Sequence, residues 1–271
     1  MPEPALKASR ADGVLTVTLD RPERRNALSL GMWRALRDTL RVAGDDPSLR
    51  VLVLTGAGGA FCSGADLGPN ESSGDGSGDG MGHPLARMRL VEETVLGLHR
   101  LPVPTVARVD GVAVGAGWNL ALACDLVVAT PRSRFSQIFA RRGLSLDAGG
   151  SWLLPRLVGL QQAKRLAFLA ETIDAEEAHR LGLVTWLREP DELDGFVAGL
   201  TARLVAGPPV ALAQSKALLD EGPGRTLAEA LGAEGRAQAV NFATDAPEAF
   251  RAFRARVDPV FTGEWHGDLD G

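Results

Sequence analysis

The sequence GVAVGAGWNLALACDLVVA, at residues 111–129, decides how we expect the chain to fold. An apolar run ends at Val114, three small residues follow, and a helix-like segment begins near Trp118. If a strand ends at Val114 and a helix starts at Gly115, the first N–H groups of the helix have no acceptor within it and lie at the positive end of its dipole. Small side chains also let another molecule approach the backbone closely. The segment therefore predicts a site for a negatively charged oxygen.

A second turn of similar character, AFCSGADL at residues 60–67, also follows a strand-like run. Two N–H donors, one from each turn, could converge on one oxygen atom. Alternatively, each turn only connects a strand to a helix.

The composition is ordinary for a soluble globular protein. The 271 residues, 45% hydrophobic and 23% charged, allow one large domain or a domain with a helical appendage. The net charge of -5 and the lack of a long basic run give no electrostatic footprint for nucleic acid or an anionic membrane. The N-terminal sequence has no apolar signal segment, and no apolar run approaches the roughly 18 residues of a membrane-spanning helix. We therefore expect a cytoplasmic protein without nucleic-acid or membrane partners.

Metal and nucleotide cofactors are not indicated. Cys62 and Cys124 lie in apolar surroundings without CxxC spacing, which predicts small buried side chains, and the four histidines form no metal-binding pair. GAGGAF at residues 56–61 follows a strand, but a dinucleotide fingerprint would need glycine where Phe61 stands.

Alternating strands and helices give way to helices alone near residue 191. We predict strands at 14–20, 51–56 and 125–130, with another beginning near 104, and helices at 30–43, 85–100, 149–157, 160–170, 191–206, 209–220, 226–240 and 246–256. The last four helices have apolar faces but no sheet of their own, so we expect them to pack on a neighbouring subunit. The Gly/Ser/Asp-rich segment at 68–84 predicts a long loop, of the kind that is either a functional lid or a disordered insertion.

Six blocks of this sequence, in order, resemble the crotonase (enoyl-CoA hydratase/isomerase) superfamily. They are RPERRNALS, AFCSGADL, VDGVAVGAGWNLALACDLVVA, FSQIFARRGLSLDAGGSWLLPRLVG, AEEAHRLGLV and PVFTG. The resemblance implies an α/β fold, a spiral of β-β-α units. Residues 1–190 would form the catalytic core, and residues 191–271 a helical region that closes a homotrimer or a dimer of trimers. It also implies an acyl-CoA thioester substrate and no cofactor other than the coenzyme A of that substrate.

The resemblance further implies which residues meet the substrate. The thioester oxygen would lie between the N–H groups of Ala65 and Ala116, where each donor could stabilise an enolate by about 3 to 4 kcal/mol. The coenzyme A moiety would lie against Arg24, Arg25, Ala27, Ser63, Asp66 and Leu67, and a neighbouring subunit would contribute Phe253 and Arg256. Basic side chains there suit phosphate groups.

Hydratases of this superfamily use two glutamates, and Asn119 and Phe139 stand at those positions here. Without these acids, each worth about 10²- to 10⁴-fold, the usual hydration is not expected. Asp147 instead matches the aspartate base of isomerase branches, including dienoyl-CoA isomerases and the epoxyphenylacetyl-CoA isomerases of phenylacetate degradation. The latter share the blocks around Asn119 and Asp147, although Leu146 stands where many of them have proline.

We therefore predict an acyl-CoA isomerase in which Asp147 alone moves a proton while the two amides hold the enolate. Trp118 and Phe139 would wall an apolar pocket that raises the basicity of Asp147. For each residue a plainer interpretation stays open. Asp147 could cap the following helix, Asn119 could be a hydrogen-bonding residue without a chemical role, and Trp118 and Phe139 could be ordinary core residues.

Two other functions also stay open. The first is an enoyl-CoA hydratase whose acids have moved, to Glu92 or Glu93 for example. The second is a non-catalytic acyl-CoA binder or an RNA-binding relative, and the acidic balance counts against RNA.

Overall fold

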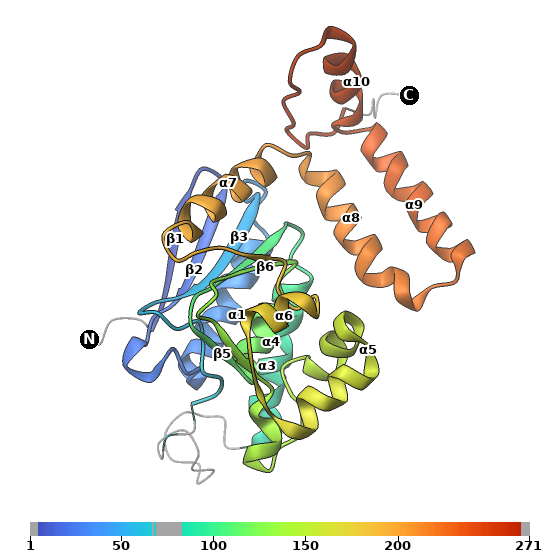
Figure 1. Ribbon diagram of the computed structural model, residues 1–271. Helices are drawn as coiled ribbons and strands as arrows, with labels where there is room; N and C mark the ends of the chain where they lie inside the picture. The colour runs from blue at the N-terminus through green and yellow to red at the C-terminus, as the bar shows by residue number, and fades with distance from the viewer. Residues whose placement is uncertain (1–4, 67, 69–82, 267–271) are drawn as a thin grey trace.

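The computed structural model describes residues 5–66, 68 and 83–266, which form two β-sheets surrounded by helices (Figure 1). The strands are β1 (Leu6–Ala11), β2 (Val14–Leu19), β3 (Val51–Gly56), β4 (Thr105–Val109), β5 (Val112–Val114), β6 (Leu126–Ala129), β7 (Arg134–Ser136), β8 (Thr172–Asp174) and β9 (Trp186–Leu187). The helices are α1 (Leu30–Gly44), α3 (Pro84–His99), α4 (Ala116–Leu122), α5 (Gly150–Leu169), α6 (Ala175–Arg180), α7 (Leu193–Val205), α8 (Pro209–Glu221), α9 (Leu227–Phe242) and α10 (Ala246–Ala255). Three short 3₁₀ helices are η1 (Pro22–Arg24), η2 (Ile138–Arg142) and η3 (Gly222–Gly224).

From β4 to β7, consecutive strands alternate between two sheets. The larger sheet has the order β1-β2-β3-β4-β6-β9 and the smaller one β5-β7-β8. Strand β4 belongs to the large sheet and β5 to the small one, and helix α4 follows them. Strands β6 and β7 repeat this pattern before α5. This repeat confirms the β-β-α spiral that the family resemblance implied.

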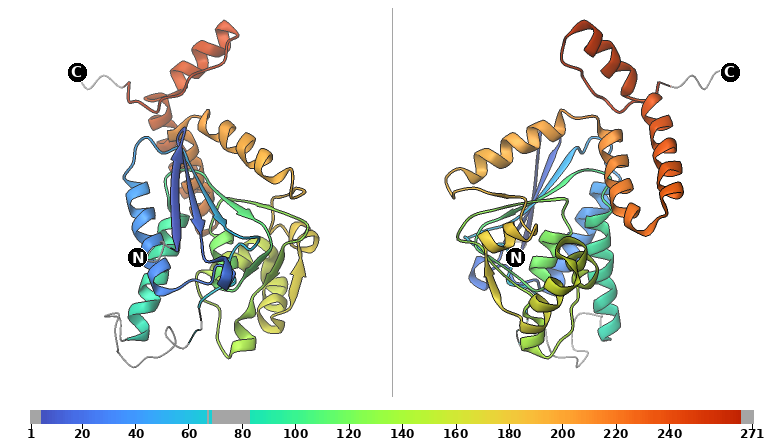
Figure 2. Two further views of the ribbon diagram at one scale, coloured as in Figure 1. Left: turned by 90° about the vertical axis from the view of Figure 1, so that its left-hand side faces the viewer. Right: turned by 45° about the vertical axis from the view of Figure 1, so that its right-hand side comes forward.

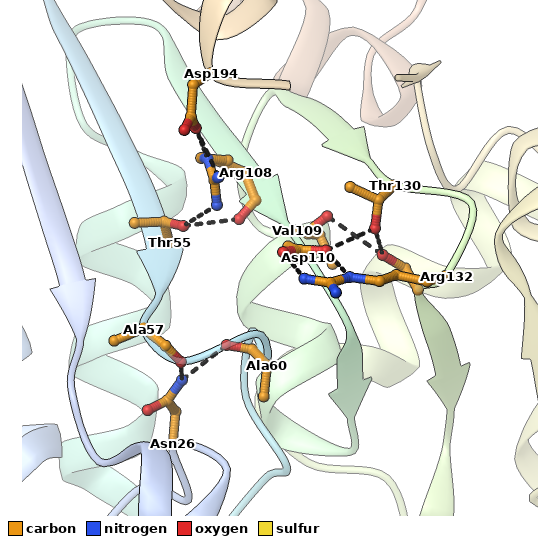
Figure 3. Close-up of polar contacts among 11 residues, drawn as sticks. Asn26, Thr55, Ala57, Ala60, Arg108, Val109, Asp110, Thr130, Arg132 and Asp194 are labelled. Carbon is orange, nitrogen blue, oxygen red and sulfur yellow. Dashed lines mark hydrogen bonds and ion pairs between the residues drawn. The ribbon is translucent and has the colours of Figure 1, made fainter. Parts of the chain in front are cut away.

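The large sheet is covered on both faces, which explains its apolar parallel strands. On one side lie α1 and α3, which pack against each other through residues such as Leu40 and Gly97. On the other side α7 packs Leu193 and Val197 against the sheet, as the views in Figure 2 show. An ion pair between Arg108 of β4 and Asp194 of α7, at 2.6 Å, joins the two elements (Figure 3).

The packing of α7 places the start of the C-terminal helical region later in the chain than predicted. We expected that region to begin at residue 191, but α7 buries its apolar face on the core's own sheet. The helices that extend away from the body are α8, α9 and α10 (Figure 1). A boundary between residues 205 and 209 therefore fits the structure better than one at 191.

Large apolar side chains on the outlying helices remain exposed. They include Leu219, Leu227, Leu231, Phe242, Phe250 and Phe253. Exposed apolar side chains of this size are typical of a surface that contacts another molecule. Packing of these helices on a neighbouring subunit stays a prediction. In the part of the chain that the structure describes, no single helix is long and apolar enough to cross a bilayer, and α7 and α8 would pass such a test only together, across a 104° bend.

The predicted long elements are confirmed and several short ones were missed. The break predicted at Gly159 is present inside α5, where this residue has φ 74° and ψ 163°. Both cysteines are buried and free, as predicted. The strands β1, β7, β8 and β9 and the helix α6 were not predicted. The predicted loop at 68–84 falls almost wholly outside the described residues.

Candidate active site

The first predicted turn joins β5 to α4. Gly115 has φ 55° and ψ -126°, a conformation that glycine adopts without steric cost. Its N–H donates to the carbonyl oxygen of Ser136 at 2.8 Å, which ties the turn to β7. Because α4 begins at Ala116, the N–H of Ala116 has no acceptor one helical turn earlier, and it donates to no other group in the described residues.

The second predicted turn is paired to Leu28 in a way that leaves the Ala65 N–H unused. Leu28 N–H donates to the Gly64 carbonyl oxygen at 2.8 Å, and Asp66 N–H donates to the Leu28 carbonyl oxygen at 3.0 Å. In this parallel bridge the residues on both sides of Ala65 bond to Leu28, so the N–H of Ala65 points the other way. No acceptor for it exists within residues 5–66, 68 and 83–266.

The two turns lie against each other. Gly64 has φ 95°, and a Cβ at this position would lie 2.9 Å from the Val114 carbonyl oxygen and 3.8 Å from the Ala116 nitrogen. Glycine is therefore required here both by conformation and by space. As a result, the Ala65 and Ala116 main chains border the same cavity.

This cavity has a volume of about 440 Å³ and mainly small and apolar walls. Its lining consists of Arg25, Ser63, Gly64, Ala65, Val112, Val114, Gly115, Ala116, Ile138, Phe139, Arg142, Leu144 and Asp147. A hollow of about 520 Å³ between α3, α5 and α8 contains neither turn. The smaller cavity is therefore the candidate site, because it combines free main-chain donors with an acid.

Asp147 lines the cavity, and its carboxyl group has no hydrogen-bond partner among the described residues. Its Oδ1 is buried and accepts no hydrogen bond from the described residues. Burial raises the pKa of Asp147 from the ordinary 3.8 to about 6, because a low-polarity environment disfavours the charged form. The interpretation of Asp147 as a helix cap is wrong, since α5 is preceded by Gly149 and has no side-chain cap. A carboxyl with this pKa can accept a proton near neutral pH and also return it.

Asn119 supports Asp147 and does not reach the cavity. It lies on α4 and is fully buried. Its Nδ2 donates to the main-chain carbonyl oxygen of Asp147 at 2.9 Å, and its Oδ1 accepts from Nε2 of Gln137 at 2.8 Å. The geometry therefore favours the interpretation of Asn119 as a hydrogen-bonding residue over a direct chemical role.

The two predicted aromatic wall residues have different places. Phe139, on η2, lines the cavity. Trp118 is fully buried and packs against Phe135 of β7 with ring centroids 5.4 Å apart. The prediction that Trp118 walls the pocket is wrong, because its side of α4 faces the small sheet.

The arginine-rich turn after β2 is attached directly to the second donor turn. Ser63 N–H donates to the Arg25 carbonyl oxygen at 3.0 Å, and Ser63 Oγ donates to the Arg24 carbonyl oxygen at 3.1 Å. Arg25 and Ser63 line the cavity. Arg24 is exposed beside them, on η1. This turn therefore places positive charge near the two main-chain donors.

Of the other predicted substrate contacts, those that the structure describes do not line the cavity within one chain. Ala27 is buried, and Asp66 forms an ion pair with Arg21 at 2.9 Å. Leu67 lies outside the described residues. Phe253 and Arg256 belong to the outlying α10 region, with Phe253 85% exposed, so their contribution from a neighbouring subunit stays a prediction.

Sequence reasoning missed Asn26, a buried residue that holds the arginine-rich turn. Its Nδ2 donates to the carbonyl oxygens of Ala57 and Ala60 at 2.9 and 2.8 Å (Figure 3), and its Oδ1 accepts from Arg21 N–H at 2.8 Å. Its φ of 57° is in the left-handed region that asparagine tolerates better than most residues. An asparagine inside the RPERRNALS turn was the available signal. Gln137 and Arg142 were also missed, and no sequence pattern singled them out.

A β-β-α spiral with two free main-chain donors over one cavity is the arrangement of a crotonase-type enzyme. The family model described as enoyl-CoA hydratase/isomerase matches residues 9–264, and the chain belongs to this family. Members act on acyl-CoA thioesters. The class of enzyme is thus established, while hydration and isomerisation both occur among the names of its relatives.

Individual relatives cover almost the whole chain. A protein of Rhodobacter capsulatus named "Probable enoyl-CoA hydratase" is 40% identical over 255 residues, 93% of this chain and 96% of its own. The 1,2-epoxyphenylacetyl-CoA isomerase of Escherichia coli is 36% identical over 253 residues, with the same coverage of 93% and 96%. The crystal structure of an enoyl-CoA hydratase from Mycobacterium smegmatis aligns with a TM-score of 0.87 at 33% identity, covering 98% of this chain and 100% of that one.

Proposed function

We propose that the protein is an acyl-CoA isomerase that shifts a double bond, or rearranges a ring, through a thioester enolate. One observation carries this proposal: Asp147 is the single acid that lines the cavity in the described part of the chain. Hydration needs one group to activate water and another to deliver a proton, whereas an isomerisation can use one carboxyl for both proton transfers.

The reaction follows from the positions of three groups. The thioester oxygen would accept hydrogen bonds from the N–H groups of Ala65 and Ala116. Asp147 would remove a proton from the carbon α or γ to the thioester, and the negative charge would move to that oxygen. The protonated carboxyl would then give the proton to a different carbon, so that the enzyme returns to its starting state. Donors that are already in place at the developing charge are worth about 3 to 4 kcal/mol each.

The walls of the cavity support this chemistry. Ile138 and Phe139 are apolar and lower the polarity around Asp147, and a bound ester that displaced water from the cavity would strengthen this effect. Arg25 at the cavity would bind a phosphate of coenzyme A. The double-bond shift requires no cofactor other than the coenzyme A of the substrate, because each of its steps is a proton transfer.

We place the complete site in a homotrimer or a dimer of trimers in the cytoplasm. The exposed apolar side chains of α9 and α10 would be covered by neighbouring subunits. Phe253 and Arg256 of one subunit would then meet the coenzyme A moiety bound to the next. An aromatic acyl group is one candidate, since the Escherichia coli relative carries the name of an epoxyphenylacetyl-CoA isomerase.

Hydration is the second candidate, because the Rhodobacter relative carries a hydratase name. Such an enzyme would need acids in the cavity other than the two missing glutamates. Glu92 and Glu93 are both exposed on α3 and do not line the cavity, and Glu93 lies 3.6 Å from Arg37. The structure therefore supports isomerisation better.

The test compares Asp147→Asn with Glu93→Gln, a matched removal of one carboxylate outside the cavity. Each variant is assayed with a 3-enoyl-CoA for isomerisation and with crotonyl-CoA for hydration. We expect Asp147→Asn to lower the isomerisation rate about 10²- to 10⁴-fold and Glu93→Gln to leave it unchanged. Rapid hydration that survives the loss of Asp147 would favour the hydratase. Tight binding without turnover of any ester in a broad panel would favour a non-catalytic binder.

A further inference from the structure

The turn that carries Asp147 has an unfavourable backbone. Ala148 has φ 46° and Gly149 has φ 82°, so two consecutive residues are in the left-handed region. For a residue with a Cβ such as Ala148, this conformation costs about 1 to 3 kcal/mol and persists only where the surroundings impose it. The turn's own hydrogen bond, from Gly150 N–H to the Asp147 carbonyl oxygen at 2.9 Å, is local. A contact from another element is therefore needed to hold this conformation.

That contact comes from the Asn119 side chain. Its Nδ2 donates to the same Asp147 carbonyl oxygen at 2.9 Å. Among the hydrogen bonds of the described residues, it is the one that joins the turn at 144–149 to α4. The approach is close enough that a Cβ on Gly150 would lie 2.5 Å from Asn119 Nδ2, so a larger residue at position 150 would displace the Asn119 amide. The position of Asp147 is thus set through its main chain.

Holding Asp147 by its carbonyl leaves its carboxyl unbound. Oδ1 of Asp147 is buried and accepts no hydrogen bond within the described chain. A donor placed directly on the carboxylate would stabilise its charged form and weaken it as a base. The arrangement orients the residue without this loss.

Gln137 anchors the other end of the Asn119 amide, whose NH₂ group must face Asp147 because a main-chain carbonyl oxygen can only accept. Gln137 is fully buried, and its Nε2 donates to Asn119 Oδ1 at 2.8 Å. With its oxygen bound to this donor, Asn119 presents its NH₂ group to the Asp147 carbonyl. If the amide turned over, two oxygens would face each other in a buried space, which is costly.

We propose that Gln137 and Asn119 form a positioning pair that holds the main chain of Asp147 and so directs its carboxyl into the cavity. Gln137 is the distant member of the pair: it makes no hydrogen bond to the Asp147 carboxyl and is not itself a lining residue of the cavity. The inference depends on the proposed function, because it takes Asp147 as the base. It predicts that a residue outside the cavity controls the rate of proton transfer and not the binding of the ester.

Gln137→Met tests the pair, because methionine keeps the length of the side chain and removes the donor. We expect kcat to fall about 10- to 100-fold, since a displacement of about 1 Å at a reacting group has an effect of this size. KM should change less than about twofold, and the acid limb of the kcat/KM profile should move below pH 6 as water reaches the carboxyl. Asn119→Leu should give a similar loss. The double variant should lose no more than the larger single loss, because both changes break one connection.

The control is Thr130→Val, which removes a buried hydroxyl that donates to Asp110 at 2.9 Å and lies outside the cavity lining. All variants are compared at one protein concentration for thermal midpoint, kcat, KM and pH profile. If Gln137→Met does not fold, Gln137→Glu replaces it, since glutamate has the same shape and, when ionised, no donor.

Two outcomes would overturn the inference. One is a folded Gln137 variant with the wild-type kcat and pH profile. The other is a Gln137 variant whose defect lies in KM, or whose fall in kcat equals that of Thr130→Val while its pH profile stays that of the wild type. Either result would indicate that Gln137 has a structural role alone. Failure of the proposed function has a different signature, namely Asp147→Asn with the wild-type isomerisation rate. An inactive Asp147→Asn beside a fully active Gln137→Met would overturn the positioning pair and leave the proposed function intact.

Discussion

The substitution Asp147→Asn should have two opposite effects above pH 6. It should inactivate the enzyme, and it should raise the free energy of unfolding. Burial raises the pKa of Asp147 from 3.8 to about 6, so the folded protein holds this proton more tightly than the unfolded chain does. Stability is therefore lost as the pH rises from about 4 to about 6, and the loss persists above pH 6. An amide has the same size and no charge, so Asp147→Asn removes this penalty.

The size of the gain follows from the pKa difference. A shift from 3.8 to about 6 corresponds to about 3 kcal/mol at 1.36 kcal/mol per pH unit. Asp147 is only half-buried and borders an open cavity, where water screens part of the charge. We therefore expect a gain of about 1 to 2 kcal/mol at pH 8 and almost none at pH 4.

The assay is urea unfolding of the wild type and of Asp147→Asn at pH 4 and pH 8. Protein concentration is kept constant, because an oligomer's apparent stability depends on it. The asparagine amide could itself lower the free energy of unfolding, but this effect does not depend on pH. The difference between the two pH values therefore isolates the carboxylate charge.

An equal effect of the substitution at pH 4 and pH 8 would refute this reasoning. It would mean that the Asp147 carboxyl is solvated in the folded protein and has an ordinary pKa. A loss of stability that appears only at pH 8 would refute it more strongly, because the carboxylate would then have a favourable partner.

Three further predictions concern the pH optimum, one donor and one structural asparagine. The acid limb of kcat/KM should have an apparent pKa near 6, because Asp147 must be ionised to accept a proton, and a limb near pH 4 in initial rates would contradict this. Gly64→Ala should lower kcat about 10²- to 10³-fold, because its Cβ would lie 2.9 Å from the Val114 carbonyl oxygen and displace one main-chain donor; steady-state kinetics with a folded variant measures this. Asn26→Ala should lower the free energy of unfolding by about 2 to 4 kcal/mol, because two carbonyl oxygens lose their donor, and urea unfolding that shows less than about 1 kcal/mol would count against it.

The sequence predicted the long elements because their patterns extend over several turns or a whole strand. In β3, residues Val51 to Thr55 are buried, which matches its continuous apolar run. The missed strand β1 has only Leu6 buried, so no alternation marks it. The missed β7 and β8 have three residues each, too few to show a period. Their pairing depends on neighbours that lie far away in the sequence.

The candidate site was predicted in part. Resemblance singled out Ala65, Ala116 and Asp147, and the structure brings all three to one cavity. The same reasoning took Trp118 for a wall residue, because a residue next to a predicted donor can lie on either side of a helix. Only its packing against Phe135 shows which side it occupies.

What the sequence determined by itself is local: turns of small residues after strand-like runs, at residues 60–67 and 114–117, and an aspartate in the turn before a helix. Tertiary structure alone decided that the two donors border one cavity and that the aspartate is a desolvated base and not a helix cap. The physical reason is that convergence and desolvation depend on atoms from distant segments. Gly64 packs against the Val114 carbonyl oxygen, and Asn119 holds the main chain of Asp147 in low-polarity surroundings. No local sequence pattern encodes either contact.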